Sequence, residues 1–268
     1  MTSAERITNV FTTRRAAGQL AFIPFITAGD PDLAMTQRLI RNLDAAAEAD
    51  LIEIGFPYSD PIADGPVIQA SYTRALGKHV KLPDIFAAVK AVSGEVTTPL
   101  LAMVAYAIIF RHGPELFVQH AAEAGFAGLI VPDLPGDEAA EFAEIVQRSG
   151  LALVQLVAPT TPPERLEKIL AHASGFVYCI AVAGTTGERE ALPSDLAGML
   201  RQLRQKTTLP LAVGFGIGKP EQVRGLKGMA DGAIVGSALV RHLEAADSQA
   251  SLKTIRDLAS LLASAAHT

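Results

Sequence analysis

The chain has 268 residues, of which 49% are hydrophobic, and its formal net charge at pH 7 is −5. That length allows one large domain of the α/β barrel kind or two small domains. The acidic balance and the lack of any Lys/Arg cluster argue against a nucleic-acid partner.

The cysteine and histidine content bears on which kinds of covalent link and metal site the chain can form. Cys179 is the only cysteine, which excludes an intrachain disulfide and a thiolate metal site. The six histidines show no pairing typical of metal ligands. The amino end does not resemble a signal peptide, and no apolar run reaches the length of a membrane span. We therefore expect a soluble, cytoplasmic protein.

Short apolar runs alternate with helical patterns along the whole chain, at intervals of roughly 25–30 residues. The predicted strands are Leu20–Thr27, Leu51–Phe56, Leu100–Tyr106, Gly128–Val131, Leu151–Val157, Phe176–Ile180, Leu209–Val213 and Gly232–Val235. The predicted helices cover 2–14, 32–49, 67–76, 82–92, 114–124, 137–149, 163–173, 194–205, 220 onward, 237–244 and 252–265. Asp30 is expected to cap the second of these helices, with Pro31 at its first position.

Strict alternation of strands and helices implies a parallel sheet. Eight such units predict an α/β fold of the (β/α)8 TIM barrel type with an extra N-terminal helix, and we expect a single domain over residues 1–268. The rival is an open doubly wound sheet. That fold usually carries a glycine-rich turn after its first strand, and 28–31, Ala-Gly-Asp-Pro, does not match the fingerprint.

Two carboxylates stand out near the end of the second predicted strand. Glu53 shares a strand face with Leu51 and Gly55, so it points into the barrel mouth if Ile52 and Ile54 pack against helices. Partial desolvation would raise its pKa, as suits a general acid or base. Asp64 can reach the same space from the following Pro- and Gly-rich loop and stay ionised, so that the two carboxylates divide the roles.

Two glycine loops form a predicted phosphate site. Gly214-Phe-Gly-Ile-Gly218 follows the seventh strand, and Gly236-Ser237 opens a helix directly after the eighth. Glycines let backbone N–H groups approach an anion, and a helix start offers unpaired donors. This is the usual position of a phosphate in such barrels. Tight turns without a ligand, and an acidic residue that merely ends a strand, are the plainer alternatives.

Several segments together resemble the tryptophan synthase alpha chain family. They are 25–31 (Phe-Ile-Thr-Ala-Gly-Asp-Pro), 51–66 (from Leu-Ile-Glu-Ile-Gly through Asp-Gly-Pro), 131–135 (Val-Pro-Asp-Leu-Pro) and 214–218 (Gly-Phe-Gly-Ile-Gly). The resemblance implies a lyase that cleaves indole-3-glycerol phosphate to indole and glyceraldehyde 3-phosphate. It also implies an αββα complex in which indole passes to a pyridoxal-phosphate β subunit. The sequence shows no metal-ligand or dinucleotide-binding pattern, so we expect no cofactor on this chain.

The resemblance also implies roles for individual residues. Glu53 matches the family's acid/base glutamate, Asp64 matches the aspartate that holds the indole N–H, and Tyr178 matches a tyrosine beside the glutamate. Phe25 matches a residue that lines the indole pocket. The family's phosphate-binding positions correspond to Gly187, Gly216, Gly236 and Ser237. Segment 183–190 corresponds to a mobile loop that closes over the substrate, and its Thr186 would approach Asp64 on closure.

The chain departs from the family pattern in two places. Ala105 stands where the family commonly has tyrosine or threonine, and Ala107 where it has asparagine; this region faces the β subunit in the family. In the mobile loop, Thr185 replaces the usual valine and Val182 stands where some members carry arginine. The departures at Ala105 and Ala107 leave open a regulatory subunit of low activity that activates a β partner. A further alternative is another phosphate-binding barrel such as a sugar-phosphate isomerase or epimerase, against which the Asp-Gly-Pro loop argues.

Overall fold

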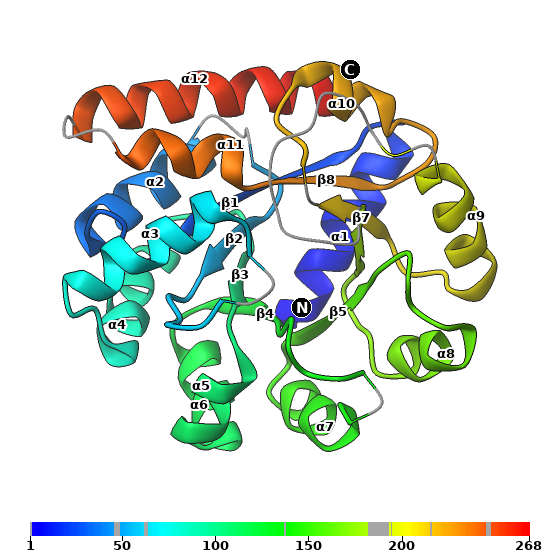
Figure 1. The fold of residues 1–268 in the computed structure, drawn as a ribbon, viewed down its shortest axis with the longest axis horizontal. Coiled ribbons are helices and arrows are strands. Elements are labelled where there is room, and N and C mark those ends of the chain that lie inside the picture. Colours follow the sequence, from blue (N-terminus) through cyan, green and yellow to red (C-terminus); the bar gives the residue numbers. More distant parts are fainter. Residues whose placement is uncertain are drawn as a thin grey trace.

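Eight parallel strands close into a barrel in which each strand pairs with its neighbours in sequence and β8 pairs with β1 (Figure 1). The computed structural model describes residues 2–45, 49–61, 64–136, 138–181, 193, 195–214, 216–244 and 248–268. The strands are β1 (Ala21–Thr27), β2 (Ile52–Gly55), β3 (Leu100–Met103), β4 (Phe126–Ile130), β5 (Ala152–Val157), β6 (Val177–Ile180), β7 (Leu211–Gly214) and β8 (Gly232–Val235). The predicted (β/α)8 barrel is confirmed.

Helices surround the barrel and fill the connections between strands (Figure 1). They are α1 (Ser3–Ala16), α2 (Leu33–Ala45), α3 (Pro66–Gly77), α4 (Leu82–Ser93), α5 (Tyr106–His112), α6 (Pro114–Glu123), α7 (Ala140–Arg148), α8 (Pro163–Ala171), α9 (Leu196–Lys206), α10 (Pro220–Gly225), α11 (Ser237–Val240), the 3-10 turn η1 (Arg241–Glu244) and α12 (Ser248–His267). Among the helices of the described residues, none combines the length and the apolar character that a membrane crossing requires.

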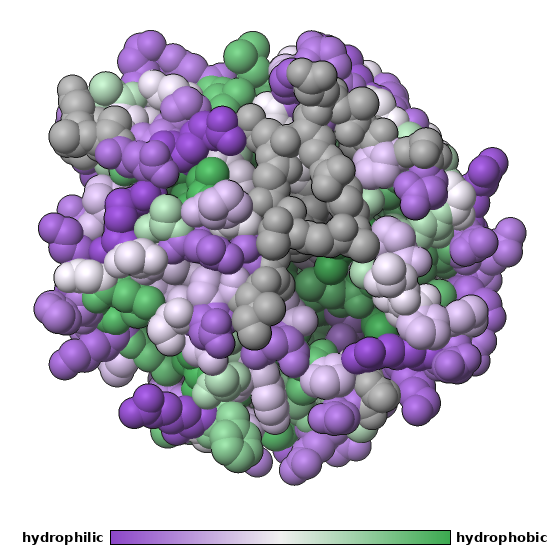
Figure 2. All heavy atoms as spheres, in the orientation of Figure 1, coloured by the Kyte–Doolittle hydropathy of each residue, from purple (hydrophilic) through white to green (hydrophobic). Residues whose placement is uncertain are grey.

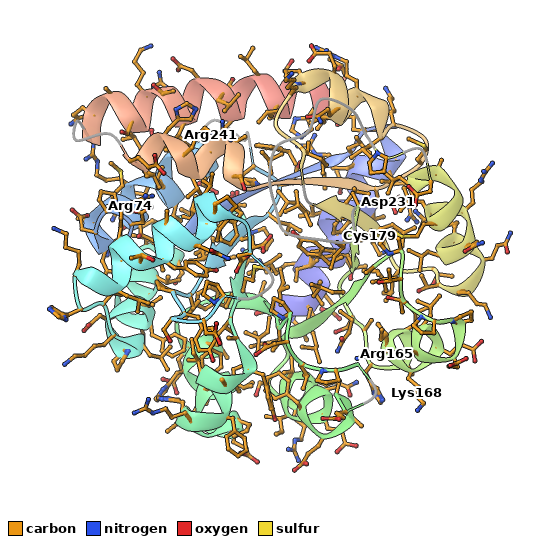
Figure 3. All side chains as sticks on the ribbon, viewed as in Figure 1. Arg74, Arg165, Lys168, Cys179, Asp231 and Arg241 are labelled. Atoms are coloured by element: carbon orange, nitrogen blue, oxygen red, sulfur yellow. The ribbon has the colours of Figure 1, made fainter. Side chains whose placement is uncertain are left out.

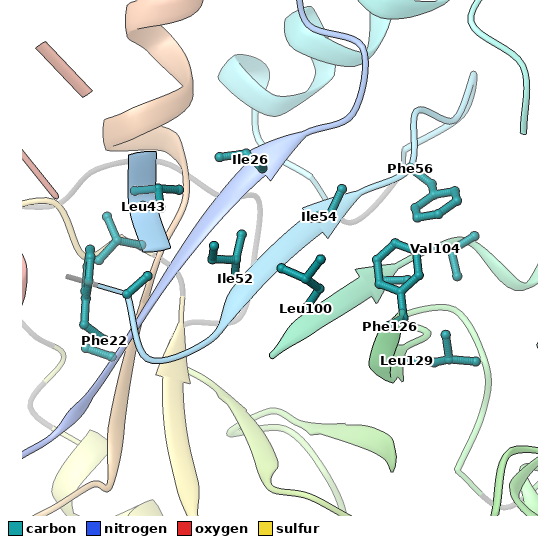
Figure 4. Close-up of a cluster of buried hydrophobic side chains, with 14 of the residues drawn as sticks. Phe22, Ile26, Leu43, Ile52, Ile54, Phe56, Leu100, Val104, Phe126 and Leu129 are labelled. Carbon is teal, nitrogen blue, oxygen red and sulfur yellow. The ribbon is translucent and has the colours of Figure 1, made fainter. Parts of the chain in front are cut away.

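The barrel has two apolar layers because successive strand residues point to opposite faces. Outward-facing side chains such as Phe22, Ile52 and Ile54 pack with the surrounding helices (Figure 4). Inward-facing side chains such as Ile23 and Leu101 form a separate core inside the barrel. Glu53 lies between Ile52 and Ile54 in sequence, so the alternation turns it inward.

Helix α1 closes the amino-terminal end of the barrel. Ile7 and Phe11 are buried in the inner core, and the Phe11 ring lies 5.3 Å from the Phe176 ring between centroids. The Ala4 backbone N–H donates to the Gly150 carbonyl at 3.0 Å. The extra N-terminal helix of the prediction is therefore a plug for one end, which leaves the carboxyl ends of the strands as the open face.

The cap of α2 was predicted wrongly. The carboxylate of Asp32, not Asp30, accepts from the Met35 backbone N–H at 2.7 Å and caps α2, which begins at Leu33. Asp30 is fully buried and its carboxylate accepts from Arg74 at 2.7 and 2.9 Å instead. Pro31 therefore precedes the cap rather than opening the helix.

The third strand is shorter than predicted. It ends at Met103, and a helix that the apolar pattern did not show, α5, begins at Tyr106. The Asp133 carboxylate accepts from the Tyr106 backbone N–H at 2.7 Å, which satisfies a donor at the start of α5. A cap supplied from the next strand's loop leaves no local signal in the sequence.

The face of the molecule in Figure 2 is hydrophilic around most of its rim, and its larger hydrophobic area lies toward the middle. This distribution agrees with a chain in which 19% of residues are charged. Within the described part of the chain, no three histidine, cysteine or acidic side chains gather closely enough to hold a metal ion.

Candidate active site

Glu53 is a fully buried carboxylate in the middle of β2. Its Cα pairs with Phe25 of β1 on one side and with Leu101 of β3 on the other. Neither Oε1 nor Oε2 has a hydrogen-bond partner within the described residues. Burial and, to a smaller extent, the nearby charge of Asp64 raise the pKa of Glu53 to about 8. Glu53 therefore carries its proton at neutral pH.

Asp64 approaches from the loop between β2 and α3. Its backbone N–H donates to the Pro61 carbonyl at 3.2 Å, and the Gln69 side chain donates to the Asp64 carbonyl at 2.7 Å, so the backbone of Asp64 is held in place. Burial raises the pKa of Asp64 to about 6. At neutral pH Asp64 is thus mostly ionised while Glu53 is mostly protonated. The two carboxylates have separated titration ranges, as an acid–base pair requires.

One cavity at the carboxyl ends of the strands contains both carboxylates. Its lining residues are Phe25, Glu53, Asp64, Ile68, Met103, Tyr178, Gly216, Ile217, Ile234, Gly236 and Ser237. The structure thus brings together all seven predicted site residues that it describes. The lining combines apolar side chains, two acids and the glycines of two loops, which suits an aromatic ligand with an anionic group.

Phe25 and Tyr178 pack so closely against the barrel backbone that glycine is required opposite them. A Cβ on Gly55 would lie 2.4 Å from the Phe25 ring, and a Cβ on Gly214 would lie 2.4 Å from the Tyr178 hydroxyl oxygen. Burial, followed by the charges of Glu53 and Asp64, raises the pKa of Tyr178 well above its ordinary value. Tyr178 is therefore a neutral phenol that can donate to a carboxylate.

The glycine side of the cavity is built from the loops after β7 and β8. Gly216 has φ +84°, a conformation that favours glycine. Gln222 fixes this loop, because its Oε1 accepts from the backbone N–H groups of Gly218 and Lys219 at 2.9 and 3.0 Å. Gly236 immediately precedes α11, and Ser237 is its first residue, where backbone N–H groups have no partner within the helix.

The remaining predicted residues fall into two groups. Thr186 and Gly187, with Val182 and Thr185, lie outside the described residues. Ala105 immediately precedes α5 and lines a second cavity that also contains Asp64. Ala107 is exposed on α5.

Sequence reasoning missed the apolar walls and one buried ion pair. Ile68, Met103, Ile217 and Ile234 have the pattern of ordinary core residues, and nothing local marks them as cavity lining. Asp30 and Arg74 lie 44 positions apart, so no helical spacing predicts their bidentate pair. Figure 3 labels Arg74 on α3. Arg74 also approaches Glu244 of η1 at 3.4 Å.

Comparison with known proteins gives a consistent result. Residues 11–267 match the family model described as tryptophan synthase alpha chain. The tryptophan synthase alpha chain of Rippkaea orientalis is 48% identical over 250 residues, which are 93% of each chain. That of Synechocystis is 49% identical over 234 residues, 87% of this chain and 88% of the relative. The crystal structure of tryptophan synthase subunit alpha from Legionella pneumophila superposes with a TM-score of 0.88 at 35% identity, covering 99% of this chain and 98% of the other.

The chain belongs to the tryptophan synthase alpha chain family.

Membership of the tryptophan synthase alpha chain family confirms the expected activity. The chain is a lyase of tryptophan biosynthesis, and its reaction is the cleavage of indole-3-glycerol phosphate. The alternative of a sugar-phosphate isomerase or epimerase is thereby overturned.

Proposed function

We propose that Glu53 performs the acid–base work of this cleavage, that Asp64 stabilises the charge on the indole ring, and that Tyr178 supports Glu53. The observation that carries the proposal is the fully buried Glu53 carboxyl group, whose two oxygens have no hydrogen-bond partner within the described residues. An unsatisfied buried carboxyl is costly, and such a group in a cavity is typical of a catalytic acid. Its proton is available to a substrate because its pKa is about 8.

The reaction proceeds in two proton transfers. Glu53 donates its proton to the indole ring carbon that carries the glycerol chain, and positive charge develops on the ring nitrogen. Asp64, ionised, accepts a hydrogen bond from the ring N–H and stabilises that charge. The Glu53 carboxylate then removes the proton from the hydroxyl on the adjacent side-chain carbon. The carbon–carbon bond breaks, its electron pair returns to the ring, and indole and glyceraldehyde 3-phosphate leave. Glu53 ends protonated, as it began.

The substrate position follows from the two sides of the cavity. We assign the indole ring to the apolar wall that includes Phe25, beside the carboxylates. We assign the phosphate to the backbone at Gly216, Gly236 and Ser237, with Thr186 and Gly187 completing the site as the family resemblance implies. The described lining includes no Lys or Arg, so backbone donors hold the phosphate in this assignment.

We also propose that the chain assembles with a β subunit in an α2β2 complex. The relative from Pyrococcus furiosus, which superposes with a TM-score of 0.84 at 40% identity over 91% of this chain and 97% of the other, is described as an a2b2 complex with mutual activation. In this proposal pyridoxal phosphate belongs to the β subunit, indole passes to it, and this chain carries no cofactor. Residues 1–268 form one domain, and the protein is cytoplasmic.

Indole release from indole-3-glycerol phosphate tests the residue assignments. Wild type, Glu53→Gln and Asp64→Asn are compared with and without a β subunit, and Asp60→Asn, an exposed acid on the same loop, is the control. Loss of the acid–base group should lower kcat by about 100- to 10,000-fold in Glu53→Gln. Turnover that survives in Glu53→Gln contradicts its assignment. No turnover by wild type even with β would favour the low-activity regulatory subunit.

A further inference from the structure

Tyr72 on α3 is a second buried tyrosine beside the carboxylates. It was not among the predicted site residues, and only 4% of its surface is exposed. It belongs to the inner core with Phe25, Ile68 and Tyr178. A buried tyrosine usually finds a hydrogen-bond partner for its hydroxyl, so the surroundings of that hydroxyl indicate its role.

The helix geometry directs Tyr72 toward Asp64. Tyr72 follows Ile68, which lines the active-site cavity, by four positions and therefore lies on the same face of α3. Side chains on a helix lean toward its amino end. The amino end of α3 is Pro66, two residues after Asp64, so the phenol leans back toward the loop that carries this aspartate.

Two further contacts place the phenol hydroxyl at the site. A Cβ on Gly55, two residues after Glu53, would lie 2.8 Å from the Tyr72 hydroxyl oxygen. Tyr72 and Asp64 also line a second cavity together, and this cavity shares Asp64 and Met103 with the active-site cavity. The hydroxyl is therefore close to the end of β2, between the two carboxylate-bearing segments.

Helix α3 is held firmly on both sides of Tyr72. The hydroxyls of Ser71 and Thr27 are 2.7 Å apart, and both residues are fully buried. Arg74 pairs with the buried carboxylate of Asp30 on β1's following loop. With residues 71 and 74 fixed, the Tyr72 ring has little freedom to move away from the site.

Asp64 and Glu53 affect the pKa values of Tyr72 and Tyr178 in opposite order of importance. Besides burial, the charge of Asp64 contributes most to the raised pKa of Tyr72, followed by Glu53. For Tyr178 the charge of Glu53 comes first and that of Asp64 second. Both phenols stay protonated, so each can only donate to a carboxylate. The arrangement provides one phenol for each acid.

We propose that Tyr72 is a positioning residue for Asp64, whose carboxylate accepts a hydrogen bond from the Tyr72 hydroxyl while it holds the indole N–H. The inference rests on the proposed role of Asp64. The hydrogen bond fixes the direction of the carboxylate and favours its ionised form. The ionisable groups of the described residues that line the two cavities beside Asp64 and Tyr72 are Glu53 and Tyr178 in the active-site cavity and Tyr58, Asp60 and Asp133 in the second cavity, so the acidic limb is read with all five in place.

Tyr72→Phe tests the proposal because it removes only the hydroxyl and keeps the packed ring. In the complex with a β subunit, kcat should fall by about 10-fold, the value of one hydrogen bond to a charged group. The acidic limb of the kcat/KM profile should move to higher pH, because Asp64 loses a donor to its ionised form. Thr73→Val, which removes an exposed hydroxyl from the same helix, is the control and should change neither.

A double-mutant cycle separates positioning from packing. If Tyr72 acts through Asp64, Tyr72→Phe should cause no further loss in an Asp64→Asn background. An equal loss in both backgrounds, or an unmoved acidic limb, would overturn the role of Tyr72 and leave that of Asp64 intact. If Asp64→Asn by itself has wild-type turnover, the assignment of Asp64 fails first, and the inference fails with it.

Discussion

The amino-terminal end of the barrel holds two partly buried aspartates that accept several hydrogen bonds, whereas the fully buried Glu53 near the carboxyl end accepts none within the described residues. Asp50 precedes β2 and accepts from Arg14 at 2.6 Å, from the Phe22 backbone at 2.8 Å and from His267 at 2.8 Å. Asp231 precedes β8 and accepts from Arg15, from Arg204 and from the Leu211 backbone N–H (Figure 3).

The comparison shows that the acids at the amino-terminal end of the barrel stabilise the fold, whereas the acid at the carboxyl end is available for function. Arg14 and Arg15 are neighbours on α1, so the two aspartates bind the plug helix to β2 and β8. At the other end the carboxyl group of Glu53 has no hydrogen-bond partner within the described residues, and the fold loses free energy there. Buried polar groups are normally hydrogen-bonded, and an exception such as Glu53 is where a functional role is expected. The three variants below test this comparison.

The largest effect on stability is expected from Glu53→Gln. The pKa of Glu53 is about 8 in the folded chain and 4.5 as an ordinary glutamate. At a pH between 4.5 and about 8, Glu53 is protonated in the folded chain and ionised in the unfolded chain, so unfolding releases a proton. The free energy of unfolding therefore falls as the pH rises through this range. Glu53→Gln should raise the free energy of unfolding by about 3 kcal/mol at pH 7 and by almost nothing at pH 4. Urea unfolding at both pH values measures it, and an equal change at both would contradict the argument.

A loss of about 2 kcal/mol is expected from Asp231→Asn at the opposite end. The variant keeps the shape of the side chain but removes the charge that two half-exposed arginines share. kcat should stay unchanged, because this end is remote from the cavity. Glu164→Gln, which removes an exposed acid on α8, is the control for the loss of charge and should leave the unfolding curve in place. If kcat fell by more than the fraction of unfolded protein explains, Asp231 would not be a purely stabilising residue and the contrast with Glu53 would be wrong.

The smallest effect, about 1 kcal/mol, is expected from Arg74→Lys. Asp30 also lies near the mouth, but it is paired, and its pKa is raised because burial outweighs Arg74. Lysine keeps the charge and loses the two-pronged contact with the carboxylate. Because α3 carries Tyr72, KM and kcat should change slightly along with the unfolding midpoint. An unchanged unfolding midpoint in Arg74→Lys would show that the bidentate geometry of the Arg74–Asp30 pair does not contribute to stability.

The sequence predicted the fold well because its signals are local. The alternation of apolar runs and helical patterns is a property of short windows, and eight such units allow few topologies. The errors arose where a distant residue decided a boundary. Asp133 caps the start of α5, and Arg74 draws Asp30 away from α2. Neither contact has a periodicity along the chain.

The candidate site likewise has features that were predicted from the sequence and features that only the structure revealed. Glu53, Asp64 and the two glycine loops were found from the sequence, because barrel strands all present their carboxyl ends to one face. The sequence by itself thus determined the barrel, the open end and the carboxylates. Only the tertiary structure decided that Glu53 has no described partner, that burial raises the pKa of Asp64 as well as that of Glu53, and that Tyr72 approaches from α3. Burial and charge act through space, between residues that the fold alone makes neighbours.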